Sequence, residues 1–217
     1  IYKDCSSSAA GFNFVNQNLD ISGSPSPGRT QIVVKPDSNR WTNANNGDIT
    51  PKCQNPNGLS YSCANGDNGA VQWFPFQSDP ITLTGTPPAS GWTFKWGLCC
   101  RPPVVNLVNP SSRSMGLRAT MYRIPNPNGT TPAFLPVNVC QDSSPEFAER
   151  PANQICRGYE FTYNHNARDA DLDSLVYSFD DPIDNNFAIV PFLGGYSAIS
   201  PLPDQNFNSQ NIPVTLN

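Results

Sequence analysis

Apolar and polar residues alternate with a period of two along several short segments of the chain. These segments are 31–35, 81–84, 92–96, 116–122, 159–163 and 174–179. Such alternation is typical of β-strands with one buried and one exposed face, whereas an amphipathic helix would repeat every 3.6 residues. Asn-Gly pairs between the segments supply the positive φ angles that tight turns require. These pairs begin at Asn46, Asn57, Asn65, Asn68 and Asn128. The pattern predicts an all-β fold.

The strand pattern is interrupted near residue 141, where a polar turn follows Cys140. We therefore expect two consecutive disulfide-stabilised β-sandwich modules, immunoglobulin-like or cadherin-like, over residues 1–140 and 141–217. The first would carry long loops rich in Asn, Pro and Gly. The second is short, because a complete module of this type needs roughly 100 residues. We expect its last strands to lie beyond Asn217 or to come from a neighbour.

Seven cysteines occur in the 217 residues, and none has the C-x-x-C spacing of a zinc site. Cysteines in this pattern indicate a disulfide framework and an oxidising, extracellular location. Cys53 and Cys63 could bond each other or other cysteines, and the adjacent Cys99 and Cys100 could reach different partners. Because seven is odd, one cysteine is free, pairs between chains or has its partner outside this sequence, and we expect the last. The disulfide candidates are Cys5, Cys53, Cys63, Cys99, Cys100, Cys140 and Cys156.

Charge and composition argue against several classes of protein. The 13 basic and 17 acidic residues give a net charge of −4, without the basic excess typical of nucleic-acid or anionic-lipid binding. No apolar run approaches the ~18 residues of a membrane-spanning helix, so we expect neither nucleic acid nor membrane insertion. A single histidine, His165, argues against most nucleophile–base triads and His-rich zinc sites. We expect a protein that is not an enzyme.

Three aspartates at alternate positions, Asp169, Asp171 and Asp173, form the strongest candidate site. Ca²⁺ takes six to eight oxygen ligands, and closely spaced carboxylates provide them. The sequence therefore predicts calcium as the cofactor, and the alternative is a solvated turn without metal. The candidate ligands are Asp169, Asp171, Asp173, Asn164, Glu146 and Asp180.

The spacing partly matches an EF-hand loop, since Asp180 would occupy the twelfth position if Asp169 were the first. However, Ser174 stands at the sixth position, where an EF-hand needs glycine, and the flanking segments are strand-like. A calcium-binding loop of a β-sandwich, as in cadherin-like modules, fits better.

Trp92, Phe94 and Trp96 would share one face of a strand. Aromatic side chains at this period usually form the inner face of a sandwich. If the face were exposed, it could stack against sugar rings, as in a carbohydrate-binding module of a secreted hydrolase. A further alternative is a repeating subunit of an extracellular filament or sheath that assembles by strand addition.

Several motifs together resemble the N-terminal region of large gliding-motility-associated surface proteins, which Bacteroidota export through the type IX secretion pathway. The run from Tyr163 to Tyr177 is the most specific match. The first half of the chain matches through its cysteines and short strings. The motifs are Ile-Tyr-Lys-Asp-Cys at 1–5, Trp-Gly-Leu-Cys-Cys-Arg at 96–101, Ser-Ser-Pro-Glu-Phe at 143–147, the run 163–177, Gly-Tyr-Ser-Ala at 195–198 and Pro-Leu-Pro at 201–203.

This resemblance implies a non-enzymatic, multi-domain protein on the outer surface of the bacterial outer membrane, acting in adhesion or gliding. Its partners would be other domains of the same large chain or neighbouring subunits, with surface glycans as a further candidate. The chain departs from the family pattern at Leu172, where the family usually has glycine. Leucine disfavours positive φ, so either the loop keeps ordinary backbone angles or the ion site is altered.

Overall fold

The computed structural model is all-β, as the alternating pattern predicts, and its described residues contain no α-helix. Two short 3₁₀ turns, η3 (Cys63–Asn65) and η4 (Pro110–Ser112), accompany the described strands. The structure describes residues 2–5, 15–39, 47–50, 62–67, 70–99, 101–125, 128, 143–149 and 161–216.

The chain divides into two compact units, each built from several separate segments. The first unit comprises residues 1–18, 31–82 and 148–166, and the second comprises 19–30, 83–147 and 167–217. Both units are therefore discontinuous in sequence. The expected module boundary at 140/141 lies outside the described residues, and two consecutive sandwich modules remain a prediction.

The first unit contains two pairs of antiparallel strands. β1 (Tyr2–Asp4) pairs with β4 (Val71–Trp73). β3 (Gln31–Pro36) pairs with β5 (Phe76–Gln77), and Lys35 lies opposite Gln77. Ile32 is buried between exposed neighbours on β3, so the strand expected at 31–35 is confirmed.

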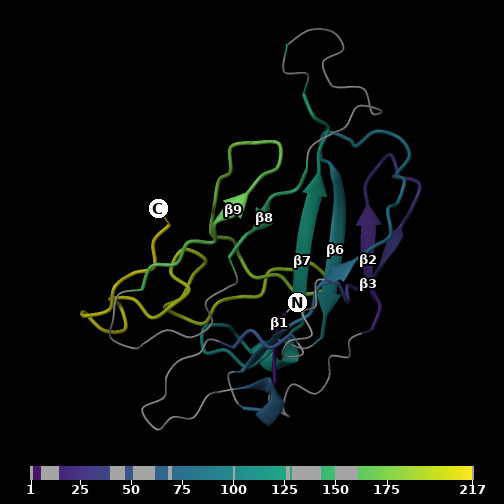
Figure 1. Ribbon diagram of the computed structural model, residues 1–217. Coiled ribbons are helices and arrows are strands. Elements are labelled where there is room, and N and C mark those ends of the chain that lie inside the picture. The colour runs from purple at the N-terminus through teal and green to yellow at the C-terminus, as the bar shows by residue number, and fades with distance from the viewer. Residues whose placement is uncertain are drawn as a thin grey trace. The chain divides into compact units, whose positions relative to one another are not determined.

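In the second unit, β6 (Trp92–Leu98) lies between β2 (Gln17–Ser22) and β7 (Met115–Met121) and is antiparallel to both (Figure 1). The part of β2 that pairs with β6 belongs to this unit, with Ile21 opposite Phe94. A separate short ladder joins β8 (Glu146–Phe147) and β9 (Ala167–Arg168).

Trp92 is the largest fully buried side chain among the described residues, and it belongs to the second unit. Its side chain is only 2% exposed, and its indole N–H donates to the Pro25 carbonyl over 2.8 Å. A Cβ at Gly23, where φ is +155°, would lie 2.5 Å from the Trp92 ring, so this turn needs glycine to cover the indole. Trp92 is therefore a core residue and cannot stack on a sugar. Phe94 and Trp96 are half-buried.

The opposite face of β6 and β7 carries a tightly seated loop around Asp184. Gly97 and Gly116 lie opposite each other in the ladder. A Cβ at Gly97 would lie 2.5 Å from the Cβ of Asn185, and one at Gly116 would overlap the Asp184 carbonyl. The Gly116 N–H donates to the Ile183 carbonyl over 2.9 Å. The glycine pair thus lets the loop pack directly on the strand backbones.

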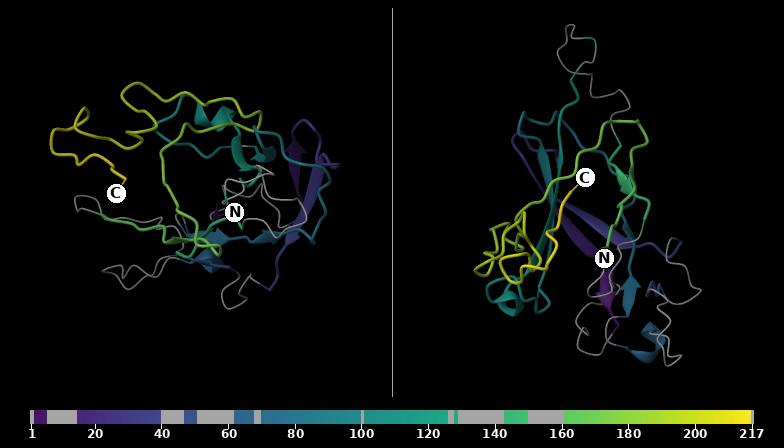
Figure 2. Two further views of the ribbon diagram at one scale, coloured as in Figure 1. Left: turned by 90° about the horizontal axis from the view of Figure 1, so that it is seen from above. Right: turned by 90° about the vertical axis from the view of Figure 1, so that its left-hand side faces the viewer.

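After β9 the chain continues largely as irregular loops (Figure 2). The strand expected at 174–179 is not formed, and neither is the one expected at 81–84, although both segments are described. At 81–84, the Thr84 N–H bonds the Pro27 carbonyl at 2.9 Å instead of a ladder partner. The remaining expected strand, 159–163, is described only from Phe161, and those residues lie outside any strand.

Candidate functional site

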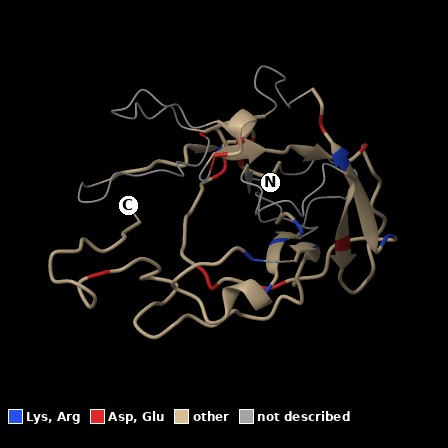
Figure 3. Cartoon of the chain, turned by 90° about the horizontal axis from the view of Figure 1, so that it is seen from below, with Lys and Arg blue, Asp and Glu red and all other residues tan. Residues whose placement is uncertain are grey.

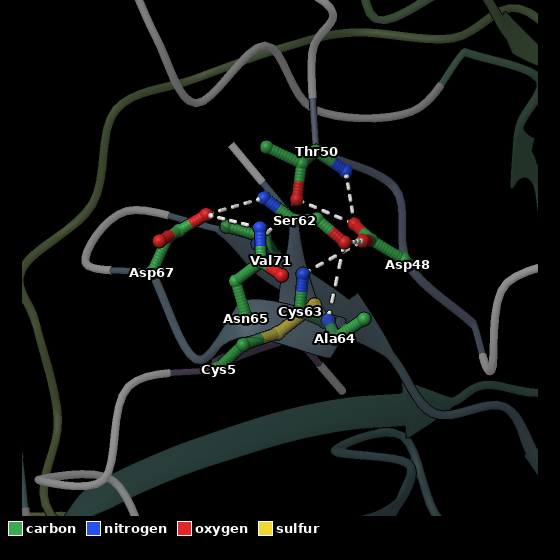
Figure 4. Close-up of a disulfide and its surroundings, with 9 residues drawn as sticks. All are labelled: Cys5, Asp48, Thr50, Ser62, Cys63, Ala64, Asn65, Asp67 and Val71. Atoms are coloured by element: carbon green, nitrogen blue, oxygen red, sulfur yellow. Dashed lines mark hydrogen bonds between the residues drawn. A yellow bond between two sulfur atoms is a disulfide. The ribbon is translucent and has the colours of Figure 1, made fainter. Parts of the chain in front are cut away.

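A disulfide bond joins Cys5 to Cys63 across a sequence separation of 58 residues, with the Cα atoms 4.9 Å apart (Figure 4). Cys5 directly follows β1, and its N–H donates to the Ala70 carbonyl over 2.9 Å. Cys99 is also disulfide-bonded. The expectation of disulfide bonds is thus confirmed for these three cysteines, and Cys63 pairs with Cys5 rather than Cys53. The other candidates, Cys53, Cys100, Cys140 and Cys156, lie outside the described residues.

The carboxylate of Asp48 connects the 47–50 segment to the turn that carries Cys63 (Figure 4). Its Oδ1 accepts hydrogen bonds from the Thr50 N–H at 2.9 Å and from the Thr50 hydroxyl. Its Oδ2 accepts from the Cys63 N–H at 2.8 Å and from the Ser62 hydroxyl at 3.2 Å. One carboxylate therefore holds two segments that are far apart in sequence beside the disulfide.

Asp67 and Thr50 extend this network around the same turn. The Asp67 Oδ2 accepts from the Ser62 N–H at 2.9 Å, and the Thr50 hydroxyl oxygen accepts from the Val71 N–H at 3.0 Å. Gly66 ends η3 with φ at +67°, a left-handed conformation that glycine adopts at little cost. The Asp48 network, comprising Asp48, Thr50, Ser62, Cys63 and Asp67, thus fixes the backbone on one side of the disulfide.

The hydrogen bonds to Asp48 change its acidity. Burial raises the pKa of this carboxyl, but the bonds from Thr50, Cys63 and Ser62 together outweigh burial and hold the pKa below its ordinary value. A carboxyl with a depressed folded-state pKa stabilises the fold above the pKa of the unfolded chain. That stability is lost as the pH falls through the folded-state pKa.

We expect Asp48→Asn to lower the free energy of unfolding by about 1–2 kcal/mol at neutral pH, because an amide nitrogen would face backbone donors. Below the ordinary aspartate pKa, the free energy of unfolding should also fall less in the variant than in the wild type. Urea unfolding across an acid pH series measures both effects. The matched control is Asp79→Asn, which removes an exposed carboxylate paired with Lys35 in the same unit. Identical acid profiles for Asp48→Asn and the wild type would contradict this role.

The predicted aspartate triplet forms a compact loop around Asp169. The Asp169 Oδ1 accepts from the N–H groups of Asp171 at 2.8 Å and Asp173 at 3.2 Å. The Asp171 Oδ2 accepts from the Ser143 N–H at 2.6 Å. This last bond continues the antiparallel register of β8 and β9, in which Glu146 lies opposite Arg168.

Of the other proposed ligands, Glu146 lies on β8 opposite Arg168, next to this loop. Asn164 and Asp180 accept hydrogen bonds from their own near neighbours. Asn164 belongs to the first unit, where its Oδ1 accepts from the Asn166 N–H at 2.8 Å. The Asp180 Oδ1 accepts from the N–H of Asp181 at 2.8 Å. Among the described residues, no group of three or more His, Cys, Asp or Glu side chains is arranged to hold a metal ion.

Leu172 has a φ of +64° and is 90% exposed at the tip of the Asp169 loop. Of the two alternatives expected at Leu172, the one in which the loop keeps ordinary backbone angles is therefore wrong. The reason is local, because the Asp169 carboxylate binds the N–H groups on both sides of Leu172 and fixes the turn. A left-handed leucine costs roughly 1–2 kcal/mol, and the Asp169 bonds offset part of that cost.

Asp48, Asp184 and Arg101 also hold loops in place, and the sequence does not indicate this structural role for any of them. The buried Asp184 carboxylate accepts from the N–H groups of Asn186 at 2.8 Å and Ala188 at 3.1 Å. The Arg101 guanidinium donates to the Ile183 carbonyl over 2.9 Å. Burial lowers the pKa of Arg101, and the nearby Asp184 charge opposes that shift. The local Asp-x-Thr and Asp-x-Asn patterns indicate turns at Asp48 and Asp184, but no sequence signal connects either residue to its distant partners.

Acidic and basic residues are scattered along the described strands and loops (Figure 3). No helix of the described chain has the length and apolar character needed to cross a membrane. Comparison with protein-family models, with curated proteins and with solved structures finds no match to this chain.

Proposed function

We propose that this chain is a non-enzymatic structural module of an exported protein that acts at the bacterial cell surface in adhesion or gliding. Its contacts would be with other domains of the same large chain or with neighbouring subunits, and its adhesive targets would include surface glycans. The resemblance through the 163–177 run and the other motifs supplies the gliding and type IX secretion context of this proposal.

The Cys5–Cys63 disulfide is the observation that carries the proposal. Disulfide bonds persist in oxidising, extracellular compartments and are rare in the bacterial cytosol. This bond staples a unit with few buried apolar side chains among its described residues, of which Ile32, Ala70 and Phe74 are the most buried. Disulfides compensate for small cores of this kind in secreted domains.

A structural role also agrees with how the acidic side chains are used. The carboxylates of Asp48, Asp169, Asp171 and Asp184 each accept a hydrogen bond from backbone N–H groups. The single histidine, His165, packs edge-on against the Tyr163 ring, with ring centroids 4.8 Å apart. The carboxylates thus orient loops, which supports a structural role.

Calcium would add stiffness at the Asp169 loop. Asp169 and Asp171 each use one carboxylate oxygen for a backbone bond. Their second oxygens and the Asp173 carboxylate would have to turn toward one another to bind a cation. Calcium completes its coordination with backbone carbonyls and water, and extracellular sites bind it with dissociation constants of roughly 10⁻⁴–10⁻³ M. The loop fits a weak site of this type better than a tight one.

We expect calcium to raise the melting temperature of the protein, because a ligand that binds only the folded state stabilises it. At ten times the dissociation constant the gain is about 1.4 kcal/mol, which corresponds to roughly 3–6 °C for a chain of this size. Thermal melts with millimolar calcium and with excess chelator measure this difference.

Asp171→Asn should abolish the calcium-dependent rise, whereas Asp181→Asn should keep it. The control makes the same change of charge at a nearby residue outside the loop. If calcium shifts neither the wild type nor Asp181→Asn, the loop is a plain turn and the calcium part of the proposal fails. The structural role, which rests on the disulfide, is tested separately.

A further inference from the structure

On the side of β7 away from β6, backbone N–H and C=O groups point outward. β7 is an edge strand, since β6 is its only partner among the described strands. The Gly116 N–H points away from β6, because it donates to the Ile183 carbonyl. Antiparallel strands alternate inward and outward pairs, so the N–H and C=O groups of Arg118 and Thr120 also point outward.

This edge is open over the length of one short strand. Leu117 is 62% exposed, and Arg118 and Ala119 are exposed as well. The outward backbone groups of Arg118 and Thr120 have no hydrogen-bond partner among the described residues. An exposed edge of this kind is a ready template for another strand, and β7 carries neither proline nor a bulge to block it.

We propose that a second copy of this chain adds its own β7 antiparallel to this edge. In the register centred on Ala119, Arg118 lies opposite Thr120 of the second copy, and Thr120 lies opposite the second Arg118. Each of these pairs exchanges both of its N–H···O bonds. Ala119 then faces its own equivalent across a two-fold axis, as in isologous dimers.

In this register the side chains of the two β7 strands are complementary on both faces of the sheet. On one face, Leu117 lies opposite Met121 of the second copy, which extends the apolar row begun by the half-buried Phe94 and Trp96. On the other face, Arg118 meets an uncharged threonine. A shift of two residues would set Arg118 against Arg118, and like charges directly opposite are unfavourable. The side chains thus favour the register centred on Ala119 over the one centred on Arg118.

The pairing ends where the Asp184 loop begins, because the Ile183 carbonyl already occupies the Gly116 N–H. Two-fold pairing also closes on itself and gives a dimer rather than a filament. This dimer is a property beyond the proposed surface role. It also differs from the filament or sheath, assembled by strand addition, that was the alternative from the sequence.

Sedimentation velocity over a range of protein concentrations tests the dimer. Ala119→Lys and Ala119→Glu each place two like charges directly opposite in the dimer, so each alone should weaken association by about tenfold or more. An equimolar mixture of the two should restore association, since opposite charges then meet. Val105→Lys, at a loop position that is 77% exposed, should dimerise like the wild type.

Hydrogen exchange on the wild type provides a readout that needs no variant. In the monomer, the amides of Leu117 and Ala119 are protected by β6, while those of Arg118 and Thr120 exchange freely. At concentrations that favour the dimer, the Arg118 and Thr120 amides should become protected. A wild type that stays monomeric at millimolar concentration overturns the proposal. A dimer whose affinity is unchanged by both Ala119 substitutions, and in which the Arg118 and Thr120 amides stay unprotected, also overturns the proposal.

Discussion

Replacing Trp92 with alanine should lower the free energy of unfolding by about 4 kcal/mol, since burial and cavity costs for Phe or Trp to Ala changes run to roughly 3–5 kcal/mol. The side chain is 2% exposed and fills the space between β6 and the turn at Gly23. Its loss also leaves the Pro25 carbonyl without the indole N–H. Chemical denaturation followed by far-UV circular dichroism measures the change.

Two further substitutions show which part of the Trp92 side chain matters. Trp92→Phe keeps most of the apolar volume and should cost about 1–2 kcal/mol, mainly through the lost hydrogen bond. Val105→Ala, at a loop position that is 77% exposed, should change stability by no more than about 0.5 kcal/mol. If Trp92→Ala proved as mild as Val105→Ala, Trp92 would not be a principal core residue of the second unit.

The second large effect concerns the disulfide. The double substitution Cys5→Ser with Cys63→Ser should destabilise the first unit by about 4 kcal/mol, because the bond closes a loop with a sequence separation of 58 residues and the loss of loop-closure entropy in the unfolded chain scales with that length. Denaturant unfolding and the rate of limited proteolysis both measure it. The turn at Cys63 should become the most sensitive region, since the Asp48 network depends on its position.

Single substitutions provide the control for the double one. Cys5→Ser and Cys63→Ser should each destabilise the protein as much as the double variant, because each already removes the bond. The changes in unfolding free energy of the two single variants should therefore not add up to that of the double variant. A double variant within about 0.5 kcal/mol of the wild type would show that the disulfide contributes little to the stability of the first unit.

The alternating pattern predicts three of the strands that find ladder partners and misses others, such as β2. It also predicts strands at two segments that have no ladder partner among the described residues. The segments 31–35, 92–96 and 116–122 correspond closely to β3, β6 and β7. The segments 81–84 and 174–179 alternate equally well, yet they lie outside strands. Alternation reports which side chains can be buried, whereas a strand also needs a neighbouring backbone to bond.

In the candidate sites, too, contacts that are local in sequence can be predicted and long-range contacts cannot. The turn around Asp169 follows from short-range chemistry, because Asp side chains bond backbone N–H groups two to four residues ahead. The Cys5–Cys63 pairing and the bond from Cys63 to Asp48 join residues far apart in sequence, and cysteine positions alone do not determine connectivity. Leu172 shows the limit of residue preference, because bonds to Asp169 impose a backbone angle that leucine disfavours.

The most direct test of the proposed role is to find where the protein resides and in which redox state. Intact cells that produce the protein are treated with a membrane-impermeant amine reagent, and the labelled chain is digested without reduction for mass spectrometry. We predict labelling of exposed lysines such as Lys35 on intact cells, together with a peptide pair linked through Cys5 and Cys63. Labelling only after lysis, with both cysteines recovered as free thiols, would contradict the account of a disulfide-stapled surface module.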